Sequence, residues 1–410
     1  MKIAFINQPI DGFIPPHHNS IGLWTHHVAP YLAEKNDVSA YFRWKPTQRS
    51  WNQEDNLRTH FVHSLPKRIV ENLDRVITPV KNKDIPIFAS QLYYLDYILP
   101  IALSLRRQQV DLVHIHNFTQ FVPIVRMINP RIKIVLHMHG EWLSQLDAET
   151  MKKRAEMCDL ILGSSDHITN LIRTRFPQLA DRCHTVHNGV NVENFSMRSD
   201  NGCRADSKKR LLFVGRVSPE KGVHVLLEAF PSIAEKHPDI ELDIIGHVGA
   251  MPMEYLVGLS DEPEVNSLAA YYHEPYGDTL NRLIPPQLAS QVHFTGNLPQ
   301  ESLIDYYQNA DVLINPSYSE SFGMSLVEAL ASGCPVVASR VGGMVEIVNG
   351  DNVGILVNRG DVTELKNAVV ELLDDNESRI AMGRAGHNMV ADRFSWPQIA
   401  QRTMDLYERV

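Results

Sequence analysis

The chain has 410 residues, of which 44% are hydrophobic and 21% are charged, so it has the composition of an ordinary globular protein of two to three domains. The net charge of −9 argues against a nucleic-acid-binding protein that depends on phosphate contacts. The four cysteines show no paired metal spacing and fit a reducing cytoplasm. The apolar stretch 95–105 is interrupted by Asp96 and Pro100, so no membrane span is predicted.

The first residues predict the start of a doubly wound α/β sheet. Residues 3–6 are too short an apolar run for a signal peptide and predict a buried strand; a helix is expected from about residue 22 to 33 and a second strand at 38–44. The segment 41–84 then carries nine Lys or Arg against five Asp or Glu, with two tryptophans. Such a segment would suit an anionic membrane surface or an anionic acceptor, although its poor periodicity favours a solvated loop and helix.

Two further predicted strands, 111–116 and 133–139, each end in a His-x-His pair. Strand alternation places His114 and His116 on one face, and His137 and His139 on one face. Four histidines at strand ends could suggest a metal site, but no cysteine or carboxylate constellation accompanies them, and we expect no metal. A buried structural role remains an alternative for His114 and His137.

A polar stretch at 197–209 predicts a linker, and a second unit begins after it. Its first strand, 209–214, runs into a loop bounded by Gly215 and Gly222, with Arg216 and Lys221 flanking the turn. Two such cations suit a diphosphate, Arg as a bidentate fork and Lys as a point charge; the alternative is a pair of surface side chains. Residues 250–284 form a long insertion of unknown role, with a helix expected near 278–283, and a final helix is expected from 396 to 410.

The stretch 311–343 has the most informative pattern in the chain. A strand at 311–315 leads through a Ser/Gly-rich turn into a helix at 324–332. The turn therefore places Ser321, Phe322 and Gly323 at a helix N-terminus, which favours an anion. Glu320 and Glu328 lie eight residues apart, and carboxylates beside a phosphate site are suited to accept hydrogen bonds from sugar hydroxyls. Taken alone, they could equally be a loop glutamate and a surface glutamate.

The Glu-x7-Glu pattern around Phe-Gly, followed by Gly-x-Pro-Val-Val-Ala and Gly-Gly, resembles the nucleotide-sugar site of family 4 glycosyltransferases. The loop from Gly215 to Gly222 is similar to that family's Gly-Arg-x4-Lys-Gly loop. The resemblance implies two Rossmann-like doubly wound α/β domains facing a central cleft, the GT-B fold, with a C-terminal helix that crosses back to the first domain. It implies an acceptor-binding domain at 1–200 plus 395–410, and a donor-binding domain at 206–392.

The same resemblance implies roles for individual residues. Those assigned to catalysis are His139, Arg216, Lys221 and Glu320. Those assigned to the donor are Gly22, Gly215, Leu298, Ser321, Phe322, Gly323, Met324 and Glu328. Those assigned to the acceptor are Asn19, His116 and Asn188. The family often has Gly-Gly where this chain has only Gly22, and Asp where it has Asn191.

We therefore expect a retaining, metal-independent glycosyltransferase that moves a sugar from a UDP-linked donor to an acceptor hydroxyl. No cofactor or nucleic acid is expected, and the protein would be cytoplasmic, with peripheral contact at the inner membrane face through residues 41–84. The alternatives are an epimerase-like enzyme and a non-catalytic nucleotide-sugar-binding subunit. A non-catalytic subunit would be expected to lack one or more of four residues that are all present here, namely Arg216, Lys221, Glu320 and Glu328. A phosphorylase would need a recognisable pyridoxal lysine site, and a dehydrogenase a Gly-x-Gly-x-x-Gly turn.

Overall fold

The computed structural model describes residues 1–10, 20–44, 56–63, 89–90, 93–197, 208–249, 252–348, 350 and 352–410. The chain folds into two compact units. The first unit is Met1–Asn188 together with Trp396–Val410, and the second is Gly189–Ser395. Residues 11–19 and most of the basic segment 41–84 lie outside the described residues, and with them Asn19 and most of the predicted membrane contact.

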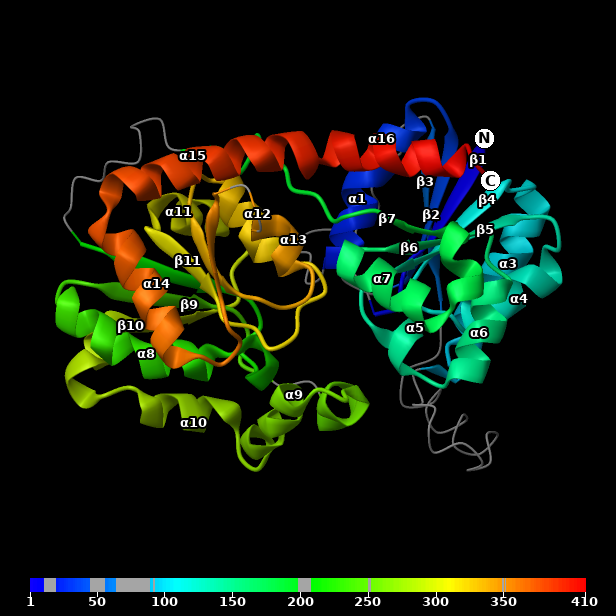
Figure 1. The fold of residues 1–410 in the computed structure, drawn as a ribbon. Helices are drawn as coiled ribbons and strands as arrows, with labels where there is room; N and C mark the ends of the chain where they lie inside the picture. Colours follow the sequence, from blue (N-terminus) through cyan, green and yellow to red (C-terminus); the bar gives the residue numbers. More distant parts are fainter. Residues whose placement is uncertain are drawn as a thin grey trace. The chain divides into compact units, whose positions relative to one another are not determined.

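The first unit contains a parallel seven-stranded sheet in the order β3-β2-β1-β4-β5-β6-β7 (Figure 1). Its strands are β1 Lys2–Ile6, β2 Asp37–Arg43, β3 Leu57–Val62, β4 Leu112–His116, β5 Lys133–Met138, β6 Leu160–Gly163 and β7 Cys183–Thr185. Strand β4 is buried along its whole length, as expected for a strand covered on both faces.

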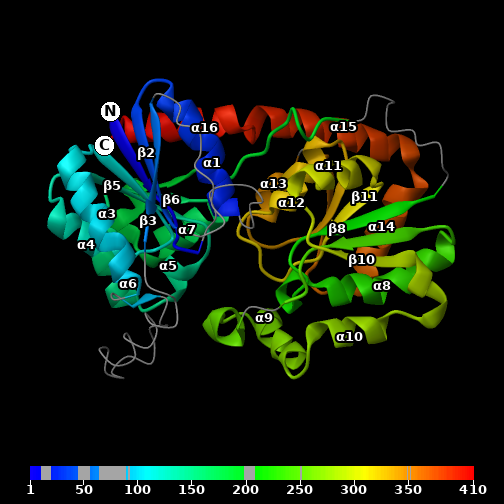
Figure 2. The same cartoon turned by 180° about the vertical axis from the view of Figure 1, so that it is seen from behind.

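Helices cover both faces of this sheet (Figures 1 and 2). They are α1 Ser20–Ala33, α3 Leu95–Gln108, α4 Phe121–Ile128, α5 Trp142–Gln145, α6 Ala148–Glu156, α7 Asp166–Arg175 and α16 Trp396–Tyr407. Helix α1 packs against α16, and the ring of His27 stacks on Trp396 at a centroid distance of 4.9 Å. The last helix of the chain thus belongs to the first unit, as the sequence predicts.

The second unit contains a parallel six-stranded sheet in the order β10-β9-β8-β11-β12-β13. Its strands are β8 Arg210–Val214, β9 Glu241–Ile245, β10 Val292–Gly296, β11 Val312–Asn315, β12 Val336–Ser339 and β13 Gly354–Val357. Alternate residues face two separate cores: Leu211 and Phe213 pack on one side, and Leu212 packs on the other.

The helices of the second unit form one layer on each side of its sheet (Figures 1 and 2). Helices α8, α10 and α14 pack together in one layer, and α12 packs against α11 and α15 in the other. Their bounds are α8 Val223–Lys236, α10 Tyr276–Leu283, α11 Gln300–Asn309, α12 Met324–Ala331, α14 Val362–Asp374 and α15 Asn376–Arg393, with the shorter helices α9 Pro263–Ser267 and α13 Met344–Val348.

Strand β3 and helix α15 are among the elements that were not predicted from the sequence. Strand β3 occupies part of the segment 41–84, where a solvated loop and helix was the alternative. Helix α15 is 18 residues long, but its apolar residues are spread around the helix, so it lacks the one-sided pattern that reveals most helices. Its start is fixed by the Asp375 carboxylate, which accepts a hydrogen bond of 2.9 Å from the Ser378 N–H.

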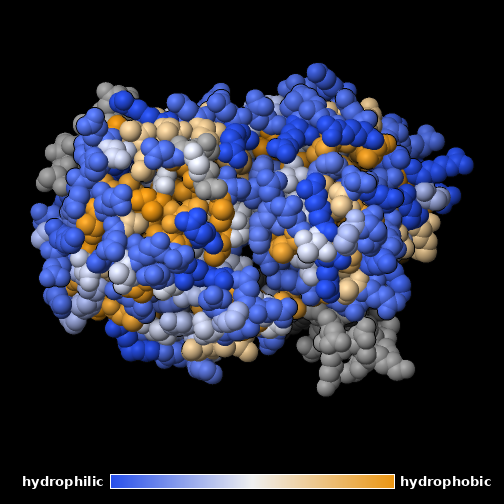
Figure 3. Space-filling model, viewed as in Figure 1, coloured by the Kyte–Doolittle hydropathy of each residue, from blue (hydrophilic) through white to orange (hydrophobic). Residues whose placement is uncertain are grey.

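Among the described residues, no helix is both long and apolar enough to cross a membrane. Figure 3 shows a largely hydrophilic surface, with apolar side chains gathered beside α11 on the second unit.

Candidate active site

The first part of the candidate site is the loop between β8 and α8. Gly215 has a φ of +156° and donates its N–H to the Ile245 carbonyl, which ties the loop to the neighbouring strand β9. The guanidinium of Arg216 lies 2.6 Å from the Glu220 carboxylate and donates from Nε to Ser218 Oγ at 3.2 Å. Glu220 is only 2% exposed, so Arg216 is held against a buried carboxylate at the carboxyl end of the sheet.

A second loop, which follows β11, packs directly on the first. The Tyr318 N–H donates to the Glu220 carbonyl at 2.7 Å. At Gly222, φ is +68°, and a Cβ would lie 2.0 Å from the Pro316 carbonyl oxygen, so only glycine permits this close approach. The two loops are also joined by an ion pair of 2.7 Å between Lys221 Nζ and a Glu320 carboxylate oxygen.

A third loop, after β12, completes this group. Gly343 donates its N–H to the Glu320 carbonyl at 3.1 Å. A Cβ on Gly342 would lie only 1.8 Å from that same carbonyl oxygen. Strands β8, β11 and β12 are adjacent in the sheet, so the loops that follow their carboxyl ends meet. That edge of an open parallel sheet is where such folds bind ligands. Thus Arg216, Lys221 and Glu320 belong to one set of contacting loops.

Helix α12 begins at the end of the second loop. Gly323 precedes it with a φ of +109°, in the conformation that favours glycine. Phe322 is 2% exposed, and its ring packs edge-to-face on Phe394 at 5.6 Å. The side chain of Phe322 therefore belongs to the hydrophobic core, and only its backbone could face a ligand. Ser321 and Met324 are partly buried on either side of this turn.

Glu328 lies inside α12, and its side chain is buried. One carboxylate oxygen accepts a hydrogen bond of 2.7 Å from the Tyr307 hydroxyl, and the other accepts one of 3.1 Å from Gln300 Nε2. Burial raises the pKa of Glu328, and these two hydrogen bonds oppose that rise. Gln300 begins α11, two residues after the partly buried Leu298, so Glu328 is connected to the turn predicted to hold the nucleotide base.

The insertion, described from residue 252 onward, is attached to these loops. Helix α10 begins at Tyr276, two residues before the predicted start, and the Tyr276 hydroxyl lies 2.8 Å from His224 Nδ1 in the first turn of α8. Burial lowers the pKa of His224 to about 4. Arg359 pairs with Glu262 at 2.5 Å and donates to the Tyr318 carbonyl at 2.8 Å. The insertion therefore supports the loops that carry Lys221 and Glu320.

In the first unit, His139 follows β5. Its backbone N–H donates to Asn117 Oδ1 at 2.6 Å, and its Nε2 lies 2.9 Å from His116 Nδ1. Burial lowers the pKa of His139 to about 3, against a smaller opposing effect of the Asn188 amide. The His139 Nδ1 and Asn188 Oδ1 atoms are both buried and have no hydrogen-bond partner within the described part of the chain.

The other three histidines form a buried cluster with His139 under α1 and α16. The ring of Trp24 lies 5.1 to 5.3 Å, centroid to centroid, from the rings of His114, His116 and His137. One ring nitrogen from each of these three lies within 4.8 Å of the others, a spacing that could suit a metal ion. The burial that lowers all three pKa values keeps the rings neutral, as ligation would require.

Hydrogen bonds already occupy several of those nitrogens. Tyr407 OH lies 2.5 Å from His114 Nδ1, and the Val186 carbonyl lies 3.2 Å from His137 Nε2. Both nitrogens of His116 are engaged, Nδ1 with His139 and Nε2 with Thr25 Oγ1 at 3.0 Å. His116 is fully buried, so the structure gives it no free ring nitrogen to offer to the predicted acceptor.

Gly22, which was assigned to the donor, lies in the first turn of α1, where the helix was expected to begin, and is buried. Four residues that form hydrogen bonds with predicted site residues were not identified from the sequence. They are Thr25, Asn117, Glu220 and Tyr307. Each comes from a segment that is distant in sequence or has no motif of its own. Only Glu220 could have been noticed, because it stands four residues after Arg216 on the same short loop.

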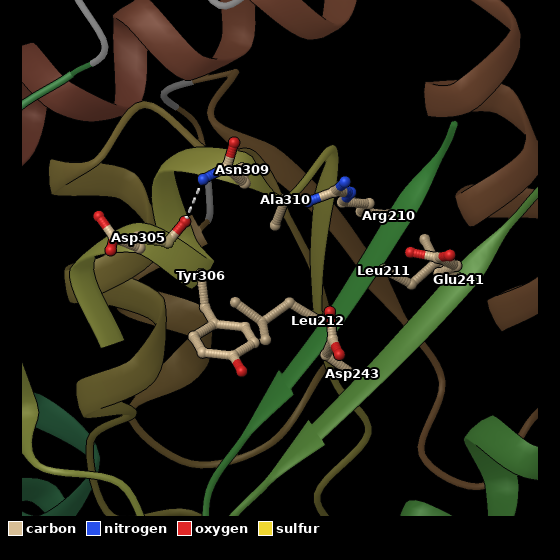
Figure 4. A pocket seen from close by; sticks show the side chains of 9 residues that line it. All are labelled: Arg210, Leu211, Leu212, Glu241, Asp243, Asp305, Tyr306, Asn309 and Ala310. Atoms are coloured by element: carbon tan, nitrogen blue, oxygen red, sulfur yellow. Dashed lines mark hydrogen bonds between the residues drawn. The ribbon is translucent and has the colours of Figure 1, made fainter. Parts of the chain in front are cut away.

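A cavity of about 330 Å³ lies elsewhere in the second unit (Figure 4). It lies at the first residues of β8 and β9, against the end of α11, and is lined by Arg210, Leu211, Leu212, Glu241, Asp243, Asp305, Tyr306, Asn309 and Ala310. These strand starts are at the opposite edge of the sheet from the three loops. None of the predicted site residues lines the cavity.

The two-unit α/β fold is that of a GT-B glycosyltransferase, and comparisons with known proteins agree. The family model for group 1 glycosyl transferases matches residues 199–389, and the model for glycosyltransferase family 4 matches residues 25–194. The chain belongs to glycosyltransferase family 4.

Relatives of several kinds are similar to this chain. Spore coat protein SA of Bacillus subtilis is 25% identical over the full length of both chains. D-inositol 3-phosphate glycosyltransferase of Corynebacterium kroppenstedtii is 36% identical over 54% of this chain and 46% of its own length. Among solved structures, sucrose-phosphate synthase from Thermosynechococcus elongatus has a TM-score of 0.74 at 21% identity, covering 100% of this chain and 98% of its own. Anabaena HepE in complex with UDP and glucose has a TM-score of 0.70 at 18% identity, covering all of both chains.

Proposed function

We propose that this protein transfers a hexose from a UDP-linked donor to an acceptor hydroxyl, with retention of the anomeric configuration and without a metal. The observation that carries the proposal is the meeting of three loops at the carboxyl ends of β8, β11 and β12, joined by the Lys221–Glu320 ion pair. The choice of UDP is supported by the similar fold of HepE, which was solved with UDP and with UDP-glucose.

In this proposal the second unit stabilises the leaving diphosphate. Negative charge develops on the phosphate as the glycosidic C–O bond breaks. Arg216, Lys221 and the backbone N–H groups at the start of α12 would stabilise that charge, because aimed donors are most effective where charge develops. Glu220 would keep the Arg216 fork in position while it binds, since the 2.6 Å contact holds one side of the guanidinium.

The two glutamates would bind hydroxyl groups. Glu320 now accepts from Lys221, and a bound diphosphate would compete for that ammonium group and release a carboxylate oxygen for the hydroxyls of the donor sugar. Glu328 would accept from the nucleotide ribose; its fixed geometry, set by Tyr307 and Gln300, suits a pre-formed contact. His139 of the first unit would contact the donor sugar. The donor phosphate would help to take the proton of the acceptor hydroxyl.

The donor assignment can be tested by thermal stability. The melting temperature of the purified protein would be measured with UDP, GDP, ADP and their sugar conjugates, and repeated with Arg216→Ala. A ligand at 100 times its dissociation constant stabilises by about 2.7 kcal/mol. We expect UDP and a UDP-sugar to raise the melting temperature of the wild type and not of the variant. A shift with GDP or ADP alone would refute the choice of UDP, and no shift with any nucleotide would refute the donor site.

Turnover and stereochemistry need an acceptor. The name of the inositol phosphate glycosyltransferase relative makes D-inositol 3-phosphate a rational first compound in a screen of hydroxyl-bearing acceptors. Anomeric coupling constants of the product, measured by NMR, distinguish retention from inversion. We expect the rate to be unchanged after exhaustive treatment with EDTA; a loss that added Mn²⁺ or Mg²⁺ restores would refute metal independence.

A further inference from the structure

A chain of buried hydrogen bonds runs from β1 to His139. It begins at Asn7, whose Oδ1 accepts a hydrogen bond of 2.7 Å from the Thr25 hydroxyl. The Asn7 Nδ2 atom donates to the Tyr41 carbonyl at 3.5 Å, which supports this orientation of the Asn7 amide. Because an amide oxygen can only accept, the single proton of the Thr25 hydroxyl is committed to Asn7. Asn7 and Thr25 are both fully buried, so water cannot exchange with this bond.

The committed proton determines the state of His116. Its Nε2 lies 3.0 Å from Thr25 Oγ1, which has no further proton to offer and must accept. His116 therefore carries a proton on Nε2. A buried neutral imidazole has only one such proton, so His116 Nδ1 presents a lone pair.

The tautomer of His139 is fixed in the same way. Its Nε2 lies 2.9 Å from the His116 Nδ1 lone pair, and one of the two atoms must donate. Since His116 Nδ1 carries no proton, His139 donates from Nε2 and retains a lone pair on Nδ1. The ring is held in place at its backbone as well, because Asn117 accepts from the His139 N–H and donates its own N–H to the His137 carbonyl at 2.8 Å.

We propose that Thr25 and His116 are positioning residues that hold His139 in its Nε2–H tautomer and so present Nδ1 as a hydrogen-bond acceptor. The Nδ1 atom is buried, and both it and the Asn188 Oδ1 atom lack a hydrogen-bond partner of normal geometry among the described residues. Although an interaction with the Asn188 amide raises the pKa of His139 and so favours a proton on the ring, in the proposed tautomer Nδ1 would accept from a hydroxyl of the sugar substrate. This last step rests on the proposed function. A hydrogen-bond donor at Nδ1 would require the opposite tautomer, which the chain from Asn7 does not allow.

The tautomers can be measured without any substrate. Long-range ¹H–¹⁵N correlation spectra of the full-length protein, labelled at histidine, distinguish pyrrole-type from pyridine-type ring nitrogens. Signals of His116 and His139 would be assigned with single His→Gln variants. We expect both residues to carry the proton on Nε2 and a pyridine-type Nδ1. A proton on Nδ1 of His139 in the wild-type protein would overturn the proposal.

Two substitutions at Thr25 separate tautomer control from simple packing. Thr25→Val keeps the shape but removes the acceptor for His116, so we expect a mixture of tautomers at His139. Thr25→Ser keeps the hydroxyl and should keep the wild-type spectrum. Thr403→Val is the matched control, since Thr403 is equally buried in the first unit and its hydroxyl donates to the Ile399 carbonyl of its own helix at 2.7 Å. If Thr25→Val does not fold, the wild-type and Thr25→Ser spectra still decide the question.

The link to the reaction is tested by kinetics. Thr25→Val should lower kcat by at least about tenfold, because the wrong tautomer removes the acceptor, while Thr25→Ser and Thr403→Val stay within about twofold of wild type. An altered tautomer with unchanged kcat would overturn the role in the reaction. A stoichiometric metal on His114, His116 and His137 would overturn the network itself, because His116 would have to give up one of its two bonds. The spectra decide the tautomer even if the proposed transfer is not found.

Discussion

The candidate site residues of the two units are held by opposite kinds of electrostatics. In the first unit, four histidines lie in a buried cluster whose pKa values are lowered chiefly by burial, so the rings are neutral and interact through hydrogen bonds. In the second unit, Arg216 and Lys221 each pair with a carboxylate at 2.6 and 2.7 Å.

This difference is informative about function. A charge is expensive to bury without a partner, so charges that must meet a ligand are kept paired and partly accessible until the ligand arrives. A neutral hydrogen-bond network can be fully buried, and there it fixes geometry and tautomer instead of providing charge. These arrangements fit the two proposals, in which the second unit would bind a diphosphate and the first would hold one ring in a defined state.

The largest expected effect is the dependence of stability on pH in the first unit. The pKa values of His114, His116, His137 and His139 are lowered in the folded state, so the unfolded chain binds protons that the folded one does not. Stability is therefore retained above about pH 6.5 and falls as the pH drops below it, by about 1.4 kcal/mol per pH unit for each histidine that stays neutral in the folded state. For His139 this loss continues down to its folded-state pKa of about 3.

Tryptophan fluorescence during urea unfolding would measure this, because the four tryptophans among the described residues, at positions 24, 44, 142 and 396, belong to the first unit. His139→Gln should remove the contribution of one histidine from the slope. A stability that does not change between pH 6.5 and 4 would contradict the neutral, buried state of the cluster.

The next largest effect concerns the paired cations. Arg216→Ala should lower the transfer rate by about 100- to 1000-fold, because it removes one donor aimed at the leaving diphosphate. Lys208→Ala is the matched control, since it breaks the Lys208–Glu241 ion pair of 2.5 Å in the same unit, away from the three loops. Rates measured at saturating donor would test this, and equal losses in the two variants would show that any broken ion pair has the same effect.

A smaller effect is expected from two glycines with similar backbone angles. Gly222 and Gly296 have φ values of +68° and +73°, so alanine at either position should cost about 1–2 kcal/mol in backbone strain. At Gly222 the added Cβ also meets the Pro316 carbonyl, whereas at Gly296 it meets nothing within 4 Å. We expect Gly222→Ala to lose about 1–3 kcal/mol more, and to weaken donor binding. Urea unfolding followed by far-UV circular dichroism would measure the difference; equal losses would show that the loops are not closely packed there.

The smallest effect is expected at the carboxylate inside α12. Tyr307→Phe removes the hydrogen bond that opposes the raised pKa of Glu328, so this pKa should rise further and stability should fall by about 1–3 kcal/mol. Tyr306→Phe is the control, because Tyr306 lines the cavity of Figure 4 instead. Calorimetric titration with UDP would then show weaker binding for Tyr307→Phe alone. Unchanged UDP affinity in both variants would show that Glu328 does not contribute to nucleotide binding.

Much of the second unit could be predicted because its elements have strong local patterns. Strands β8 and β11 and helix α12 differ from the expected ranges by one residue at an end. The first unit was harder, because β3 lies within a polar, basic segment and the loop 11–19 lies outside the described residues. The roles assigned to the site residues remain predictions, and the structure shows only which of them come together.

The sequence alone determined the alternation of strands and helices and the glycosyltransferase family, because both depend on residues close together in the chain. Only the tertiary structure decided the partners of those residues. Lys221 and Glu320 are 99 residues apart, and Thr25 and His116 are 91 apart. They meet because parallel strands that are distant in sequence are neighbours in a sheet, and each crossover brings another loop to the same edge. Local patterns carry no information about such pairings, so the contact between the His116 and His139 rings and the ion pair at Glu320 became visible only in the folded protein.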